Sequence, residues 1–140
     1  MEFPKMPLEY QHKLFNRNNY NMKKGDVFLL TCKQNYFEKI RPGDLESKEK
    51  VGYKKLVEIA KEYFRNNEYE IFAGFFQEGQ YFIALWAAHL VLEYGTANQA
   101  IVSSALSIIK DYSDNPLAPD VAVQETLWLK ANIAKYNGDK

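Results

Sequence analysis

Hydrophobic residues recur three and four positions apart through much of the chain, which is the spacing of one face of an α-helix. The clearest example is the segment 48–66, where lysines and glutamates fill most of the other positions. No proline occurs between residues 43 and 115, and proline is the residue that a helix interior tolerates least. The pattern therefore predicts a helix over 48–66. Its apolar stripe is Val51, Tyr53, Leu56, Val57, Ala60, Tyr63 and Phe64.

The segment 80–95, QYFIALWAAHLVLEYG, has no polar face. From Tyr81 to Leu92 only His89 is not apolar. A helix that is apolar all round is enclosed by its neighbours, and this run is shorter than the roughly 20 residues that a bilayer requires. We therefore expect this segment to be the central helix of a hydrophobic core.

Capping signals predict a helix on either side of this segment. Asn67 resembles an N-cap and predicts a short helix over 67–77. Thr96 and Gln99 match the S/T-x-x-Q capping box, which predicts a helix over 97–113.

A last helix is predicted over 121–136, because Pro119 followed by Asp120 is typical of a helix start. Its hydrophobic positions are again three and four residues apart, so one stripe should face the core. The residues expected to point inward are Val123, Leu127, Trp128, Ala131 and Ala134.

The N-terminal third is less regular. Residues 7–15 could form a short helix, and the asparagine-rich segment 16–21 reads as a loop. Asp26 could cap a helix through Ile40, with a strand over 27–31 as the alternative; length favours the helix. The sequence thus predicts one all-α domain over 1–140 with six or seven helices, in which 1–45 is the least certain segment.

Composition excludes several classes of function. The chain has 18 Lys+Arg and 18 Asp+Glu, a formal net charge of +0. A protein that binds nucleic acid through its phosphates needs a net basic surface, so direct nucleic-acid binding is not expected. The single cysteine permits no internal disulfide. The first residues lack the apolar run of a signal peptide, so we expect a cytoplasmic protein with no membrane partner.

The two halves of the chain carry opposite charge. Residues 1–65 contain 14 Lys/Arg and 9 Asp/Glu, a net of +5, whereas residues 66–140 contain 4 and 9, a net of −5. Such an asymmetry can steer a charged partner. The alternative is that solvated helix faces differ in composition without function.

No catalytic arrangement has the spacing that its chemistry needs. Two histidines and one cysteine are a poor ligand set for zinc, and Asp111, Asp114 and Asp120 lack the pattern of a calcium loop. His89 is interpreted as a core histidine whose ring N–H binds a carbonyl, with a ligand or acid–base role as the alternative. No metal, cofactor or small-molecule ligand is expected.

Four segments between residues 56 and 132 resemble one family. They are LVEIAKEYF, FIALWAAHLVLEYG, ANQAIVSSALSIIKDYSDNP and AVQETLWLKAN. They are similar to short bacterial helical proteins of unknown function with HEAT-like packing. The resemblance implies an all-α, HEAT-like stack with residues 46–138 as its core. The matching core positions are Trp86, Ala87, Ala88, Leu92 and Leu127.

Proteins that look like this are often encoded beside contact-dependent inhibition or other polymorphic toxins, as their cognate immunity proteins. The resemblance implies that this chain binds and occludes a bacterial toxin domain, such as a nuclease, in the cytosol. Because a nuclease must be basic to hold its substrate, an acidic, tyrosine-bearing surface would compete for the same site and needs no catalysis. The expected partner-binding residues are Glu68, Tyr69, Glu70, Glu78, Asp111, Tyr112 and Asp114.

Three alternatives stay open. A helical scaffold could bind a peptide in a concave groove, with weaker and broader affinity than an immunity protein. An enzyme would require a pocket in which His89 and Glu93 meet solvent. An acidic partner would instead use the lysines of the first half, namely Lys23, Lys24, Lys48, Lys50, Lys54 and Lys55.

Overall fold

The computed structural model describes residues 23–137. Within this range the chain forms seven α-helices, two short 3₁₀ helices and no strand, so the predicted all-α class is confirmed. None of these helices is long and apolar enough to cross a membrane. The expected helix over 7–15 and loop over 16–21 lie outside the described residues. In chain order the elements are α2 (Lys24–Phe37), η2 (Leu45–Glu49), α3 (Val51–Arg65), α4 (Tyr69–Ala73), η3 (Gly74–Gln77), α5 (Ile83–Tyr94), α6 (Gln99–Ser113), α7 (Pro119–Asn132) and α8 (Ala134–Asn137).

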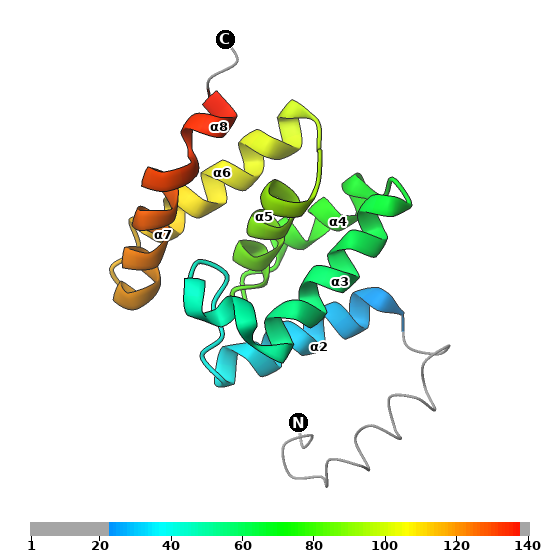
Figure 1. Cartoon of the computed structure of the whole chain (residues 1–140), viewed down its shortest axis with the longest axis horizontal. Helices are drawn as coiled ribbons and strands as arrows, with labels where there is room; N and C mark the ends of the chain where they lie inside the picture. The colour runs from blue at the N-terminus through cyan, green and yellow to red at the C-terminus, as the bar shows by residue number, and fades with distance from the viewer. Residues whose placement is uncertain (1–22, 138–140) are drawn as a thin grey trace, which may run out of the picture.

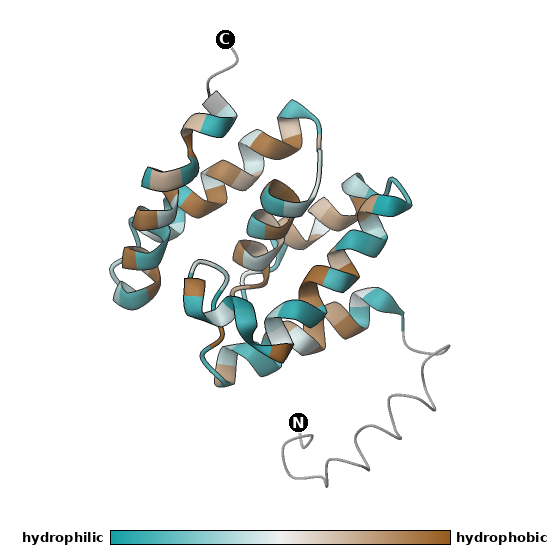
Figure 2. Ribbon diagram, viewed as in Figure 1, coloured by the Kyte–Doolittle hydropathy of each residue, from teal (hydrophilic) through white to brown (hydrophobic). Residues whose placement is uncertain are grey.

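Helix α5 runs through the middle of the molecule, with α2 and α3 on one side and α6 and α7 on the other (Figure 1). Every residue from Ile83 to Leu92 is buried. The prediction of a central helix over this segment is therefore confirmed, and its cause is the missing polar face. On α3, by contrast, polar and apolar residues alternate around the helix (Figure 2), because only one stripe meets the core.

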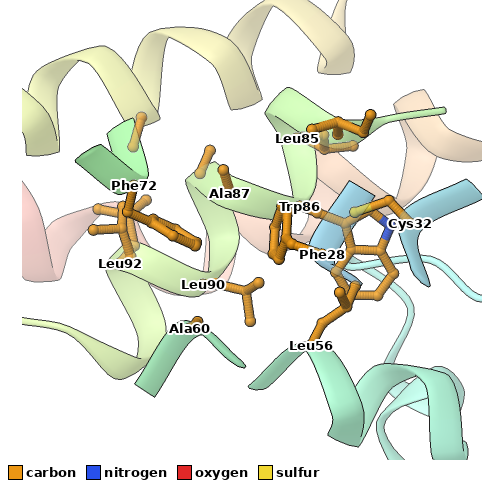
Figure 3. Close-up of a cluster of buried hydrophobic side chains, with 14 of the residues drawn as sticks. Phe28, Cys32, Leu56, Ala60, Phe72, Leu85, Trp86, Ala87, Leu90 and Leu92 are labelled. Carbon is orange, nitrogen blue, oxygen red and sulfur yellow. The ribbon is translucent and has the colours of Figure 1, made fainter. Parts of the chain in front are cut away.

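The core between α5 and the α2–α3 pair is built around Trp86. Its indole meets the ring of Tyr53 edge to face, at 5.3 Å between centroids. Figure 3 shows Phe28, Cys32 and Leu56 beside it. Cys32 has no exposed surface, and burial raises the pKa of its thiol well above the ordinary value. The prediction of a buried thiol is therefore confirmed. The strand alternative over 27–31 is wrong, because these residues belong to α2.

Three predicted helix starts are wrong. Asp26 does not cap α2, because this helix begins at Lys24 and Asp26 lies in its first turn. Asn98, not Thr96, caps α6: its side-chain oxygen accepts a hydrogen bond from the backbone N–H of Ile101 at 2.9 Å. Asn67 has a left-handed backbone (φ 56°) immediately after α3. Asparagine is favoured both as an N-cap and in the left-handed region, so its presence alone does not tell a helix start from a helix end.

The inward face of α7 also differs from the prediction. Val121 and Glu125 are buried and Trp128 is half-buried. Because Glu125 is charged, the face that contains it does not stand out as hydrophobic in the sequence. A second apolar stripe on the same helix, which faces solvent, gives the stronger hydrophobic pattern. Four of the five residues predicted to point inward, Val123, Leu127, Ala131 and Ala134, are exposed.

Candidate functional site

The seven residues predicted to bind a partner lie in two groups at opposite ends of α5. Tyr69 meets Thr96 just beyond the C-terminal end of α5, whereas Tyr112 meets Phe82 at its N-terminal end. The 12 residues of α5 span about 18 Å at 1.5 Å per residue. The two groups are therefore separate clusters. The first contains Glu68, Tyr69 and Glu70, and the second contains Glu78, Asp111, Tyr112 and Asp114.

The first group holds helices together. Glu68 accepts a hydrogen bond from the Nζ of Lys24, on α2, at 2.8 Å. The hydroxyl of Tyr69 accepts one from the backbone N–H of Thr96 at 2.9 Å, and its ring stacks on Phe64 of α3 at 4.8 Å. Both side chains are occupied by contacts within the fold, which makes them weaker candidates for a partner surface than the sequence suggests.

The second group lies beside a cluster of five aromatic side chains that we call the aromatic corner. They come from the C-terminal ends of α2 and α6 and from the turn before α5. Each ring centroid lies within 6.0 Å of another. Exposed aromatic side chains of this kind are enriched at protein interfaces. The members are Tyr36 (38% exposed), Phe37 (67% exposed), Tyr81, Phe82 and Tyr112.

The turn that carries two of these rings is strained. Tyr81 and Phe82 are consecutive and have φ values of 53° and 58°, a left-handed conformation that bulky residues rarely adopt. Each such residue costs on the order of 1–2 kcal/mol. Strain of this kind persists only where the surroundings enforce it, and it clusters at functional sites. The turn therefore presents its two rings in a fixed geometry at some cost in stability.

Two cations lie beside the aromatic corner: Lys33, whose Nζ is 5.5 Å from the ring centroid of Tyr81, and Arg41. Its guanidinium lies 4.9 Å from the ring centroid of Phe82 and 5.8 Å from that of Tyr36. It also lies 3.8 Å from the carboxylate of Asp120, at the start of α7. Its Nη1 is buried and has no hydrogen-bond partner. Arg41 thus links the aromatic corner to α7, and its Nη1 group has no hydrogen-bond acceptor.

Three unpaired carboxylates border the aromatic corner. Glu78 precedes α5, and its backbone oxygen accepts a hydrogen bond from Ala84 at 3.1 Å. Asp111 and Asp114 lie at the end of α6. All three are exposed, and none forms an ion pair with another residue in 23–137. This end of α5 therefore combines exposed aromatic rings with three unpaired carboxylates, beside the cations Lys33 and Arg41.

A second arrangement of functional groups is buried between α5 and α7. Nε2 of His89 lies 2.6 Å from Oε1 of Glu125, and Nδ1 lies 2.9 Å from Oε2 of Glu93. Glu93 also accepts hydrogen bonds from the indole N–H of Trp128 at 2.9 Å and from Lys48 at 3.1 Å. We call these five side chains the histidine network.

Contacts within the histidine network shift the pKa values of His89 and Glu93. Burial alone would lower the pKa of His89, but the charge of Glu125 and hydrogen bonds to Glu125 and Glu93 outweigh it and raise the pKa to about 9. Burial would raise the pKa of Glu93, but His89 and Lys48 outweigh it and hold the pKa below its ordinary value. At neutral pH His89 is therefore protonated, and its imidazolium donates from both nitrogens. The second oxygen of Glu125, Oε2, is buried and has no hydrogen-bond partner.

This geometry changes the interpretation of His89. The prediction of a core histidine is confirmed, since it is 1% exposed. The predicted carbonyl partner is wrong, because both ring nitrogens face carboxylates. The catalytic alternative needed His89 to meet solvent, and it does not. Glu125 lies 36 residues after His89 in the sequence. The spacing of residues along a single helix therefore cannot predict that the two side chains meet.

The lysines of the alternative surface are partly neutralised. Lys24, Lys48 and Lys54 lie 2.8, 3.1 and 3.7 Å from glutamate carboxylates. These pairs reduce the positive charge that an acidic partner would meet, so the lysine placement gains no support from the structure.

Within residues 23–137, no group of three or more histidines, cysteines, aspartates or glutamates is placed to hold a metal ion. The residues that the sequence analysis missed are those of the aromatic corner other than Tyr112, together with Arg41. The pair Tyr-Phe is a weak sequence signal for them: it occurs at 36–37, 63–64 and 81–82, and the first and third pairs meet in space.

Comparison with protein-family models, with curated proteins and with solved structures found no match for this chain.

Proposed function

We propose that this protein is an immunity protein that binds and occludes a cognate bacterial toxin domain, such as a nuclease, through the aromatic corner and the carboxylates beside it. The observation that carries this proposal is the exposed Tyr36–Phe37 pair, held against the strained Tyr81–Phe82 turn. The half-buried rings of Tyr81 and Phe82 pack against the exposed pair, so the fixed geometry of the strained turn pre-organises this surface for binding.

The composition of this surface suits a basic protein partner. Aromatic residues and arginine dominate the energetic centres of protein interfaces, and both occur here. Unpaired carboxylates at the rim accelerate encounter with a basic molecule and disfavour acidic ones. An inhibitor that blocks a nuclease in this way needs no catalytic group of its own.

We also propose that the helix pairs stack in a HEAT-like manner. The packing of α2 on α3 and of α6 on α7, with α5 between the two pairs, supports this arrangement. Such stacks present an extended surface for a protein partner.

Neutralisation of the toxin tests the proposal. The chain is co-expressed with the C-terminal domain of the protein encoded by the adjacent reading frame, and growth and complex formation are measured. The wild-type chain should rescue growth and form a complex with that domain. The triple variant Glu78→Lys, Asp111→Lys, Asp114→Lys should weaken the complex by at least about tenfold, which is about 1.4 kcal/mol.

The matched control is Glu70→Lys, an exposed carboxylate of the first group, which should leave the affinity within about twofold. Equal affinities of the triple variant and the wild type, or no complex with the adjacent product, would contradict the proposal.

A scaffold that binds peptides is the second candidate, and one feature favours it: a hollow between residues 43–46 and α7. Affinity distinguishes the two functions. An immunity protein should bind one toxin domain with a nanomolar or lower Kd, whereas a scaffold should bind several peptides in the micromolar range.

A further inference from the structure

A hollow of about 340 Å³ lies between the segment 43–46 and the outer face of α7. Figure 1 shows this segment, at the start of η2, beside α7. Gly43 packs closely on α7, because a Cβ added there would overlap the carboxylate of Glu125. This contact fixes the segment against α7 and thereby fixes the shape of the hollow.

The walls of the hollow are largely apolar. They include the side chains of Leu45 (77% exposed), Leu127 (60% exposed) and the half-buried Trp128. A long aliphatic side chain could lie along the two leucines, and the indole offers an aromatic face for a planar or charged group.

The hollow is lined by groups that can accept hydrogen bonds: the carboxylates of Asp44 and Glu46 and the side-chain oxygen of Gln124. Asp44 and Glu46 line it, and neither forms an ion pair with another residue in 23–137. The oxygens of Asp44 accept hydrogen bonds from the Glu46 N–H and the Ser47 hydroxyl at the start of η2, so Asp44 contributes its charge and Glu46 the open acceptor. Oε1 of Gln124, which also lines it, is buried and has no hydrogen-bond partner. A buried acceptor without a donor costs free energy until a donor arrives. No lysine, arginine or histidine lines the hollow.

We infer that this hollow binds an arginine side chain of the partner protein. The aliphatic stem lies against Leu45 and Leu127, and the guanidinium donates to Oε1 of Gln124 and faces the carboxylates of Asp44 and Glu46. Guanidinium has five donors in a planar fork and stacks on aromatic rings, so it can serve a carbonyl, a carboxylate and an indole together. An ammonium is a compact point charge and matches fewer of these groups.

A neighbouring hollow fixes the position of the cation. It has a volume of about 530 Å³, shares Leu45 and Trp128 with the first, and is lined by Lys48 and Lys135. Glu93 also lines this neighbouring hollow and pairs with Lys48 at 3.1 Å, so Lys135 is the cation that disfavours a guanidinium there. The guanidinium therefore binds at the end near Asp44 and Glu46.

The identity of the occupant as a partner's side chain rests on the proposed function, whereas the preference of the hollow for guanidinium does not. The test therefore uses small probes in place of the partner. The full chain, labelled with ¹⁵N, is titrated with N-acetyl-arginine N-methylamide, with the lysine analogue and with the uncharged norleucine analogue, and amide and indole shifts are followed by NMR.

The arginine probe should shift the signals of residues 44–46, Gln124 and the Trp128 indole, with a Kd in the millimolar range. The lysine and norleucine probes should bind at least about fivefold more weakly. Glu46→Gln and Gln124→Leu should each weaken the arginine probe by about threefold or more. Glu49→Gln, an exposed carboxylate of the same 3₁₀ helix outside the hollow, is the matched control and should have no effect.

Three results would overturn the inference: equal binding of the norleucine or lysine probe, shifts confined to the hollow of Lys48 and Lys135, or no saturable shift at all. Probe binding with an unaffected toxin complex in the carboxylate triple variant would reject the proposed site and leave the guanidinium preference standing. If the triple variant weakened the toxin complex but no probe bound, the proposed binding site would stand and the guanidinium preference of the hollow would be rejected.

Discussion

Nε2 of His89 and Oε1 of Glu125 lie 2.6 Å apart across the interface between α5 and α7, and neither side chain is more than 1% exposed. This bond sets which face of α7 points inward. Because Glu125 turns toward His89, Val123 and Leu127 turn toward solvent. The hydrophobic face that the sequence assigns to the core thus becomes part of the outer surface.

The stability of the protein should depend on pH through His89. Its pKa is raised from about 6.5 to about 9, so the folded state binds more protons than the unfolded state between these values. The free energy of unfolding should therefore fall as the pH rises from about 6.5 to about 9, by up to about 3 kcal/mol. Urea unfolding at a series of pH values measures this slope.

Glu125→Gln serves as the matched variant for that slope. The amide can still accept a hydrogen bond from His89 but carries no charge, so the pKa of His89 should drop and the decrease between pH 6.5 and about 9 should shrink. An identical pH profile for wild type and variant would show that the pair does not titrate as described.

Gly43 should be intolerant of a side chain. A Cβ there would overlap the buried carboxylate of Glu125, so Gly43→Ala should destabilise the protein by about 1–3 kcal/mol. Gly79→Ala is the control, because nothing lies within 4 Å of a Cβ at that position, and it should be neutral or slightly stabilising. Equal effects of the two substitutions on thermal unfolding would contradict the position of the 43–46 segment.

Two residues of α7 distinguish the structure from the sequence prediction. Val121 is fully buried and Leu127 is 60% exposed, so Val121→Ala should cost about 2 kcal/mol of stability. Leu127→Ala should change it by less than about 0.5 kcal/mol. If Leu127→Ala proved the more damaging, α7 would face the core as the hydrophobic pattern suggests.

Much of the fold could be predicted from sequence because the relevant signals are local. The absence of a polar face over 83–92 identified α5, and the absence of proline identified the surrounding helices. The inward face of α7 could not be found in this way, because Glu125 is buried only by virtue of His89, which lies on another helix. A hydrophobic pattern predicts the burial of apolar residues. It does not predict that a charged residue is buried because it binds a partner on another helix.

The candidate site was only partly predictable for the same reason. Tyr112, Asp111 and Asp114 stand out by composition, but their proximity to Tyr36 and Phe37 arises from the packing of α2 and α6 around the start of α5. The left-handed backbone of Tyr81 and Phe82 has no sequence signal, since glycine or asparagine would normally occupy such positions.

The affinity for the cognate toxin domain, measured by isothermal titration calorimetry, tests the central claim most directly. Phe37→Ala should raise the Kd by about 30-fold, as expected for an interface hot spot worth about 2 kcal/mol. Ile71→Ala, a 62% exposed residue of α4, should change it by less than about threefold. A Kd for Phe37→Ala equal to that of the wild type would show that the partner binds elsewhere.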